Sequence, residues 1–399
     1  MASIRPEDLH RSPNAIASDY SRFRVSERLL FTGHSHQAWP DVAFEGTVEA
    51  FNDSATLVDD KWPRAFEKAD AVRRGYARLL GDSPNNVALA ENTHELVTKW
   101  ISALPLRKRP RLVTTDGEYH SIRRQLDRLA EEKIIELVKV GATPVADLAE
   151  RLAATVDDRT SAALVSSVLF RTGEIVPNLS VVARACVAKG AELLIDAYHQ
   201  MNVVPFSLDG IENAFVTGAG YKYCQLGEGN AFLRMPDGCN LRPVITGWFS
   251  EFALKEQAPT KGVPYGEGGM RFAGATYDPT ANYRGAAVFD YFEMKQLTPE
   301  LLRDVSQHQV RLVLERFDAL DLPDNILTRD RSFPLETIAG FVVLRSPCAG
   351  EICKMLHDAG VYTDYRADAL RIGPAPYLSD AQIEGAMRIL GKVVRGLAR

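Results

Sequence analysis

A carboxylate and a lysine each lie close behind a short apolar run that has the length of a strand. Asp196 ends the run Leu-Leu-Ile-Asp, and Lys222 stands in Gly-Ala-Gly-Tyr-Lys-Tyr, shortly after the run 214–217. Because ligands of an open parallel sheet bind beyond the carboxyl ends of its strands, we expect both side chains at one site. A lysine amine can form a Schiff base with an aldehyde cofactor, and a buried carboxylate can keep a pyridinium nitrogen protonated. The pair therefore predicts a pyridoxal 5'-phosphate site.

Each of these residues also has an ordinary structural interpretation, which taken alone is commoner than a catalytic one. Lys222 can be a surface loop lysine, Asp196 a helix cap, and the nearby His199 a core histidine with its hydrogen bonds made. Only the combination favours a functional site. The small residues before Lys222 predict a backbone that a ligand can approach closely.

The elements that must position these residues follow from the order of apolar patterns. Between about 86 and 235, runs of strand length alternate with stretches of helical period, which is typical of βαβ units and a mainly parallel sheet. The expected strands are 111–115, 134–140, 162–168, 191–196, 214–217 and 231–235. The sequence therefore predicts an α/β fold.

A smaller α+β domain is expected after residue 297, with a long helix, a strand at 341–345, a helix at 349–359, two short strands and a helix at 380–397. The pairs Thr143–Pro144 and Thr298–Pro299 predict helix starts, since a capping hydroxyl before a proline suits the first helical turn. The expected division is an N-terminal arm with part of the small domain (1–45), a large cofactor-binding domain (46–296) and a C-terminal small domain (297–399).

The composition excludes several classes of protein. With 46% hydrophobic and 25% charged residues, the chain is neither disordered nor fibrous. A net charge of -5 offers no broad basic field, so we expect no nucleic-acid partner. The absence of a secretory signal and of an apolar run of about 18 residues predicts a cytoplasmic protein without a membrane partner. The five cysteines are scattered without a CxxC pair and predict neither disulfides nor a metal site.

Around the two key residues, the sequence resembles the class V branch of the aspartate-aminotransferase superfamily, and kynureninases most closely. Asp-Ala-Tyr-His (196–199) is similar to the family's Asp-Leu-Ala-His, and Gly-Tyr-Lys-Tyr (220–223) to its Ser-Tyr-Lys-Tyr around the Schiff-base lysine. The resemblance runs from about 31 to 390. It implies fold type I, a large domain with a mainly parallel seven-stranded sheet, a smaller α+β domain, and roles for His199 beside the cofactor and Tyr221 on its phosphate.

Further motifs of the family occur in the same order. Glu-Asn-Thr (91–93) resembles the phosphate-binding turn and implies roles for Asn92 and Thr93, although a plain helix cap has the same pattern. Glu-Tyr-His-Ser (118–121) resembles Asn-Phe-Pro-Ser and makes Tyr119 the aromatic residue stacked on the cofactor ring; the alternative is a packed surface tyrosine.

Three more segments imply contacts to the cofactor. Ser-Ser-Val-Leu-Phe-Arg-Thr-Gly (166–173) is similar to a kynureninase motif that places Ser166 near the ring hydroxyl. Gly-Trp-Phe-Ser (247–250) implies that Trp248 belongs to the phosphate site. Arg-Phe-Ala-Gly-Ala-Thr (271–276) resembles a segment that crosses a dimer interface, which implies a role for Thr276 and a homodimer with its active site between subunits.

Two segments correspond to parts of the family that bind the substrate. Leu-Arg-Ile-Gly-Pro-Ala-Pro (370–376) is similar to the family's Leu-Arg-Val-Ala-Pro-Val-Pro, whose arginine forks onto the substrate α-carboxylate, and this implies that role for Arg371. Where kynureninases read Pro-Gly-Asn-Ser-Leu-Gly, this chain reads Thr-Gly-His-Ser-His-Gln (32–37), which makes His34 and His36 candidate substrate-binding residues or solvent-facing ones. Asp-Asp-Lys-Trp-Pro (59–63) stands where the family surrounds the aromatic part of kynurenine with Gly and His, so the exact substrate stays open.

The resemblance implies a hydrolase. Lys222 would move the α-proton of an amino acid, Asp196 would keep the electron sink protonated, and Tyr221 would relay a proton. Water would then cleave the Cβ–Cγ bond of L-kynurenine or a related γ-keto amino acid to an aromatic acid and L-alanine.

Four alternatives remain open. A class V aminotransferase needs the same lysine and aspartate. A cysteine desulfurase or selenocysteine lyase is less favoured, because its nucleophilic cysteine precedes the carboxylate-binding arginine, and 362–366 contains none. A non-catalytic protein that binds the cofactor, or an α/β protein without it, completes the set.

Overall fold

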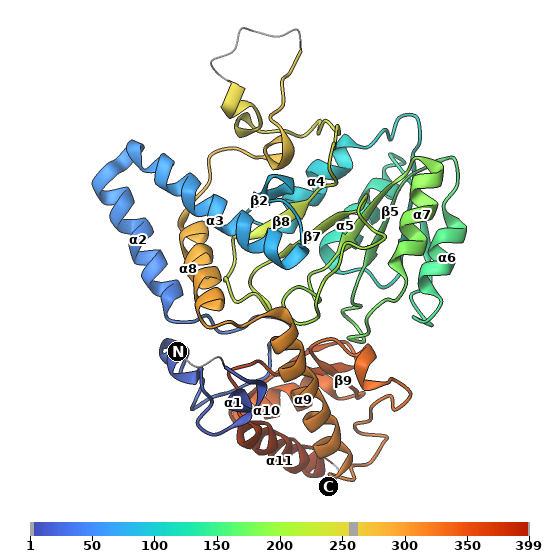
Figure 1. The fold of residues 1–399 in the computed structure, drawn as a ribbon. Helices are drawn as coiled ribbons and strands as arrows, with labels where there is room; N and C mark the ends of the chain where they lie inside the picture. Colours follow the sequence, from blue (N-terminus) through green and yellow to red (C-terminus); the bar gives the residue numbers. More distant parts are fainter. Residues whose placement is uncertain (1–3, 255–261, 398–399) are drawn as a thin grey trace.

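A twisted seven-stranded sheet forms the centre of the upper lobe in the computed structural model, which describes residues 4–254 and 262–397 (Figure 1). Its strands are β2 (Val87–Ala90), β3 (Arg111–Thr115), β4 (Glu136–Val140), β5 (Thr160–Ser166), β6 (Glu192–Asp196), β7 (Phe215–Ala219) and β8 (Ala231–Arg234). Their order is β2-β8-β7-β6-β5-β3-β4. Strands β3 to β7 are parallel, and β8 is antiparallel to both of its neighbours. The predicted α/β fold with a mainly parallel sheet is confirmed.

The ends of the strands were harder to predict than their existence. Strand β5 covers 160–166 instead of the expected 162–168, and β2 was not among the expected strands. Every residue of β5 is buried. A strand that is covered on both faces shows no alternation of polar and apolar residues, so no pattern in the sequence marks where it stops.

Helices cover both faces of the sheet, and alternate strand residues pack against them. On one face Leu194 belongs to the same apolar cluster as Trp100 and Leu126, and on the other Ile195 packs with Leu152. The helices of this lobe are α2 (Val42–Leu57), α3 (Trp62–Leu80), α4 (Thr93–Ala103), α5 (His120–Glu131), α6 (Leu148–Thr155), α7 (Leu179–Lys189) and α8 (Thr280–Met294). Short 3-10 turns are η2 (Val58–Lys61), η3 (Pro84–Asn86), η4 (Trp248–Leu254) and η5 (Gly268–Phe272).

One of the two expected helix starts is wrong. Helix α6 begins at Leu148, and Thr143–Pro144 lies in the loop before it. The guanidinium of Arg151 on α6 donates to the carbonyl oxygens of Gly141 and Pro144, so side-chain contacts from the helix that follows hold this segment as a loop. A local capping pattern cannot anticipate such contacts.

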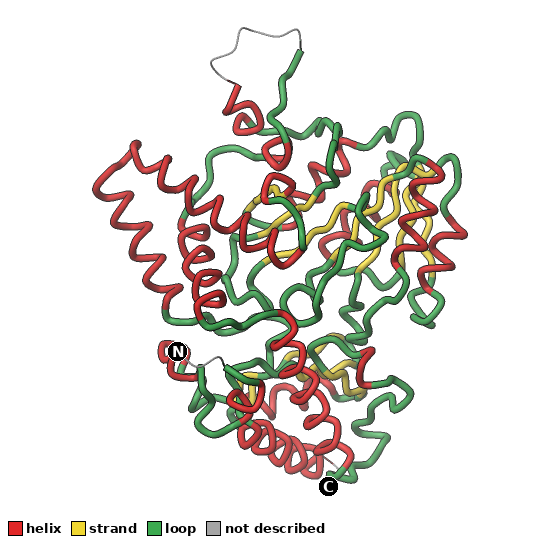
Figure 2. Tube along the Cα trace, in the orientation of Figure 1, coloured by secondary structure: helices red, strands yellow, loops and turns green. Residues whose placement is uncertain are grey.

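The lower lobe contains the C-terminal elements in the expected order, except that three short strands instead of two follow the helix Ala349–Asp358 (Figure 2). Its helices are α9 (Pro299–Asp318), α10 (Ala349–Asp358) and α11 (Asp380–Leu397), with η6 (Leu335–Thr337). Its three-stranded sheet has the order β11 (Asp364–Arg366), β12 (Ala369–Ile372) and β9 (Val342–Arg345). Thr298 caps α9 by accepting a hydrogen bond from the Leu301 amide at 3.3 Å, which confirms the second expected helix start.

The N-terminal arm packs beside this lobe and then turns toward the large sheet. It contains α1 (Pro6–His10), η1 (Ala17–Phe23) and β1 (Leu29–Leu30). Strand β1 pairs in parallel with β10 (Val361–Tyr362), and Thr32 bridges Gly373. The three-part domain division stays a prediction. Within the described residues, no helix is long and apolar enough to cross a membrane.

Candidate active site

The parallel strands deliver the predicted site residues to one edge of the sheet. Ser166 ends β5 and pairs with Asp196, which ends β6 and pairs with Thr217 on β7. Lys222 follows β7 after a short turn. Because these three strands are neighbours and run the same way, their carboxyl ends, and the residues after them, share one site.

Lys222 is buried, and its amine lies between polar and aromatic groups. Its Nζ lies 2.7 Å from Nε2 of His199, 4.8 Å from the ring centre of Tyr198 and 5.4 Å from that of Tyr119. Burial lowers the pKa of the Lys222 amine well below its usual value, and the nearby carboxylate of Asp196 only partly opposes this. A lysine with a lowered pKa is a nucleophile and a base near neutral pH.

Asp196 is buried at the bottom of the same site. Its Oδ1 accepts a hydrogen bond from the Tyr198 amide at 2.9 Å. Burial raises the pKa of the Asp196 carboxyl, while that amide and the charge of Lys222 lower it. The carboxyl group therefore favours a positively charged partner that would relieve the cost of its burial.

The glycines before Lys222 are required by internal packing, and the close approach of a ligand to their backbone stays a prediction. A Cβ on Gly220 would lie 2.6 Å from the Cβ of Leu226, and one on Gly218 would lie 2.9 Å from the ring of Phe232. Both contacts are internal to the fold. The small residues let β7 and the turn after it pass close to β8 and to the segment that leads into β8.

The predicted phosphate-binding turn is a helix N-terminus. Asn92 caps α4 by accepting a hydrogen bond from the Glu95 amide at 3.0 Å, and Thr93 is buried with its Oγ1 3.5 Å from the Gly218 carbonyl oxygen. Asn92 is therefore a helix cap, and its role in binding a phosphate stays a prediction. The positive end of α4 still points to the segment that leads from β7 to Lys222, which suits an anion.

Glu118 is a site residue that sequence reasoning missed. Its carboxylate accepts hydrogen bonds from the Ser166 hydroxyl at 2.6 Å, the Ser166 amide at 3.1 Å and the Thr115 hydroxyl at 2.7 Å. Burial raises the pKa of Glu118 to about 7. The hydroxyl of Ser166 therefore already donates a hydrogen bond to Glu118. The signal lay in the motif 118–121, where an acid stands in place of an amide.

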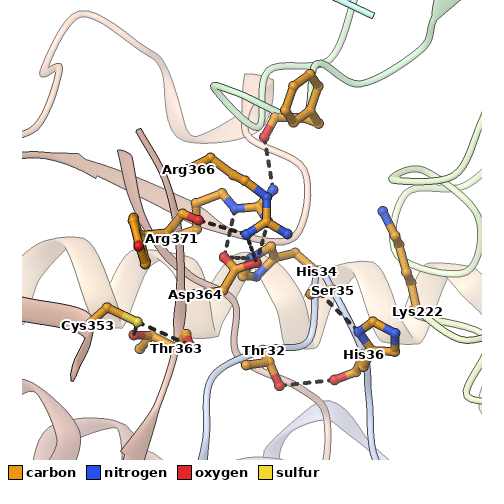
Figure 3. A network of polar contacts seen from close by, with 12 residues as sticks. Thr32, His34, Ser35, His36, Lys222, Cys353, Thr363, Asp364, Arg366 and Arg371 are labelled. Atoms are coloured by element: carbon orange, nitrogen blue, oxygen red, sulfur yellow. Dashed lines mark hydrogen bonds and ion pairs between the residues drawn. The ribbon is translucent and has the colours of Figure 1, made fainter. Parts of the chain in front are cut away.

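Arg371 reaches the site from the lower lobe, and its guanidinium is already paired with a carboxylate of the protein. Its Nε donates to Oδ1 of Asp364 at 2.8 Å, its Nη2 contacts Oδ2 of the same carboxylate, and its Nη1 donates to the Phe170 carbonyl oxygen at 3.2 Å. Figure 3 shows this network with Lys222 across from it. Asp364 was not anticipated from the sequence.

The two candidate histidines of the arm have different surroundings. His34 is fully buried, with its Nε2 2.8 Å from Oδ1 of Asp364, so it is not solvent-facing. His36 is exposed, stacks on the ring of Tyr221 with centroids 4.9 Å apart, and lies 3.5 Å from Glu228. The arm therefore reaches the edge of the site beside Lys222, as Figure 3 also shows for His36.

Two predicted cofactor contacts lie at the surface of this chain. Trp248 is 40% exposed and packs against Phe249 with ring centroids 4.2 Å apart, and Thr276 is exposed on the segment after η5. Their segments lie in the part of the upper lobe remote from the lower lobe in Figure 1. A residue that contributes to the site of a second subunit must be exposed on its own chain, and both residues meet this condition.

Comparison with known proteins agrees with this arrangement. The family model described as the kynureninase C-terminal domain matches residues 333–390, which contain Asp364 and Arg371. A kynureninase from Bacillus cereus is 24% identical over 371 residues, which cover 90% of this chain and 83% of that protein.

Two further relatives match over shorter stretches. An uncharacterized aminotransferase, YcbU of Bacillus subtilis, is 24% identical over 51% of this chain and 54% of its own length. Isopenicillin N epimerase of Streptomyces clavuligerus is 28% identical over 45% of this chain and 46% of its own length. The matched region thus spans about half the length of these two proteins.

Solved structures share the fold. A cystine C-S lyase, C-DES, in complex with its product cysteine persulfide superimposes with a TM-score of 0.81 at 18% identity, covering 92% of this chain and 98% of that one. A cysteine desulfurase of Thermococcus onnurineus gives a TM-score of 0.79 at 18% identity, covering 99% and 100%. The chain is therefore a relative of the class V pyridoxal-phosphate enzymes, with their fold type I architecture, and is similar to kynureninase.

Proposed function

We propose that this protein is a pyridoxal-phosphate enzyme that acts on an amino acid, with a kynureninase-like hydrolysis of the Cβ–Cγ bond as its reaction. The observation that carries the proposal is the buried amine of Lys222, with its lowered pKa, beside the buried carboxyl group of Asp196. The products would be an aromatic acid and L-alanine.

The residues present suit this cofactor. The Nδ1 atom of His199 is buried and has no hydrogen-bond partner within residues 4–254 and 262–397, although its Nε2 meets Lys222. The rings of Tyr119 and Tyr198 border the amine, which provides aromatic faces for a flat heterocycle. An amine, an acid, an unsatisfied imidazole nitrogen and a helix N-terminus are the groups that such a ligand needs.

When bound, pyridoxal phosphate supplies an electron sink for the pair left on an amino acid's α-carbon. Lys222 is the residue that would hold the cofactor, and its amine, with a lowered pKa, would move a proton at the substrate's α-carbon. Asp196 holds a proton on the ring nitrogen. Arg371 binds the α-carboxylate, Tyr221 binds the phosphate and relays a proton, and Asn92, Thr93 and His199 complete the binding site, with Ser166 acting beside Glu118.

An aminotransferase is the second candidate, supported by the similarity to YcbU. A desulfurase is less favoured, because Cys353 lies on α10 with its sulfur 3.6 Å from the Thr363 carbonyl oxygen, and no cysteine occurs in 362–366. Stoichiometric transfer of an amino group to the cofactor would favour the aminotransferase. A non-catalytic binding protein would show no spectral change with any amino acid.

We also propose a homodimer whose active sites lie at the interface, because Trp248 and Thr276 are exposed on this chain. A cytoplasmic location and the absence of nucleic-acid and membrane partners remain predictions.

The proposal is tested by the absorbance of the purified protein before and after mixing with L-kynurenine or 3-hydroxykynurenine. We expect a band at roughly 420 nm that is absent in Lys222→Ala, together with release of L-alanine and the fluorescent aromatic acid. If the band forms without these products, the cofactor assignment stands and the substrate is a different amino acid. No band after reconstitution with the cofactor would refute the proposal.

A further inference from the structure

The carboxylate of Asp364 and the guanidinium of Arg371 form a pair whose geometry is set by the backbone. Asp364 on β11 and Arg371 on β12 are directly opposite each other in the antiparallel register. The carboxylate meets the guanidinium side-on, through Nε at 2.8 Å and through Nη2. The register therefore places the two side chains next to each other on the same face of this sheet.

His34 holds the carboxylate from the other side. Its Nε2 lies 2.8 Å from Oδ1 of Asp364, the same oxygen that Nε of Arg371 contacts. Burial lowers the pKa of His34 to about 4, so the ring is neutral at pH 7 and its Nε2–H donates. The ring is wedged against Gly373, where an added Cβ would lie 2.2 Å from Nδ1 of His34. A segment far away in sequence thus fixes the acceptor that Arg371 uses.

Phe341 places the same groups beside the catalytic lysine. Its buried ring stacks with His34 at 4.8 Å, lies 5.8 Å from the Arg371 guanidinium and contacts the ring of His199 at 5.4 Å. His199 in turn contacts Lys222. The ring of Phe341 therefore lies against both the Arg371 guanidinium and His199, the residue that contacts Lys222.

The side-on pair leaves part of the guanidinium for a ligand. An arginine has five N–H donors, of which the structure uses Nε–H, one on Nη2 and one on Nη1. Each Nη atom retains a second N–H, and these nitrogens form the fork that binds a carboxylate end-on. Asp364 also supplies the negative charge that a buried arginine requires.

We propose that Asp364 and His34 are positioning residues, which orient Arg371 so that its remaining N–H groups receive the α-carboxylate of the amino-acid substrate. This rests on the proposed function, in which Arg371 binds that group. The opposite possibility is that Asp364 competes with the substrate for Arg371. The two predict opposite effects of removing the charge of Asp364.

The test compares two ligands of the holoenzyme, L-alanine and L-alaninamide, which differ only in the carboxylate. Binding is followed by the cofactor spectrum and by calorimetry, so that the comparison remains possible if no band forms. In Asp364→Asn we expect L-alanine to bind about tenfold more weakly or worse, because one arm of the side-on fork is lost, and L-alaninamide to change less than about twofold. His34→Gln keeps a neutral N–H donor. Its affinity for L-alanine should therefore lie between those of Asp364→Asn and the unmodified protein.

The chain offers a matched control in a second histidine–aspartate pair. Nε2 of His308 lies 2.9 Å from Asp380, and both residues belong to helices of the lower lobe. His308→Gln and Asp380→Asn should leave the preference for L-alanine unchanged. Melting temperature and cofactor absorbance are recorded for all variants, so that a folding defect is recognised by equal losses for both ligands.

Tighter binding of L-alanine by Asp364→Asn, or an unchanged preference in both site variants, would overturn the positioning role while the cofactor assignment stands. Equal binding of the two ligands by the unmodified protein would show that Arg371 does not read the carboxylate. That result would overturn this inference and leave Lys222 and its cofactor untouched. A protein that takes up no cofactor would refute the proposed function itself.

Discussion

The ionisation of single buried groups decides the chemistry of this site. Lys222, Asp196 and Glu118 are all nearly inaccessible to water, and in each the burial acts against the charged form. The pKa of Lys222 is therefore lowered, whereas those of the two acids are raised. Such opposed shifts within one site are what acid–base catalysis near neutral pH requires.

The lysine should make the stability of the cofactor-free protein depend on pH. Because its pKa is lowered in the folded state, the unfolded chain binds more protons at pH values below the ordinary lysine pKa of 10.5. The free energy of unfolding should therefore rise as pH increases from neutral toward 10.5. Urea unfolding at several pH values would measure this rise, and Lys222→Met should lack it; an equal rise in both proteins would contradict the assignment.

Glu118 should show the opposite dependence. Its pKa is raised from 4.5 to about 7 by burial, so the folded state binds the extra proton between these values, and stability falls as pH rises through that window. Glu118→Gln keeps the shape of the side chain and removes the ionisation. We expect the variant to gain on the order of 2 kcal/mol relative to the unmodified protein between pH 5 and pH 8. Denaturant unfolding at the two pH values is the measurement, and a constant difference would refute the expectation.

At the scale of elements, the N-terminal arm and the end of β12 form a close contact between parts of the chain that are far apart in sequence. Gly33 and Gly373 face this contact, and an added Cβ on Gly373 would also lie 2.9 Å from the backbone nitrogen of His34. The arm is thereby held in the position from which His34 reaches Asp364.

Gly373→Ala should therefore destabilise the protein by about 1–3 kcal/mol, since the arm must move to make room. Gly385 in α11 is the matched control, because among the described residues outside its own helix backbone an added Cβ would meet only Arg388 Nη2, at 3.8 Å. Alanine there should stabilise the helix by about 0.5–1 kcal/mol. Thermal unfolding of the two variants should show shifts of opposite sign; two shifts of the same sign would contradict the steric argument.

At the scale of the whole molecule, a site built on one lobe is completed by the other lobe and by the arm. Lys222 and Asp196 come from the upper lobe, and Arg371 comes from the lower one. The exposed apolar side chains Val244, Ile245 and Trp248 are close together in the sequence, on a segment that we expect a second subunit to cover. Large exposed apolar patches mark such contacts.

A mixing experiment tests the shared site. Lys222→Ala and a Trp248→Ala/Thr276→Ala double variant should each have little activity. Random re-association of the two should restore about a quarter of the normal activity, because half of the dimers are mixed and each has one intact site. The control is a mixture of each variant with itself. No recovery, with mixed dimers verified by differently tagged chains, would place all site residues within one subunit.

The sequence by itself determined the parts of this protein that depend on local pattern. Alternating strands and helices predicted the parallel sheet, and the residues after two apolar runs predicted that Asp196 and Lys222 share a site. Helix α11 was predicted at its observed bounds because its amphipathic period is read along one continuous segment. The helix expected at Thr143 begins instead at Leu148, and the side chain of Arg151 on that helix binds the carbonyl groups of the loop before it.

Only the tertiary structure decided which partners the site residues have. Asp364 and His34 are separated by most of the chain, and they meet because β1 pairs with β10 and the arm then continues past Gly373. Glu118 became a site residue because β3 and β5 are neighbours, which brings Ser166 to its carboxylate. Burial, which sets the pKa values of Lys222, Asp196 and Glu118, is a property of the packed molecule, and no local pattern of residues contains it.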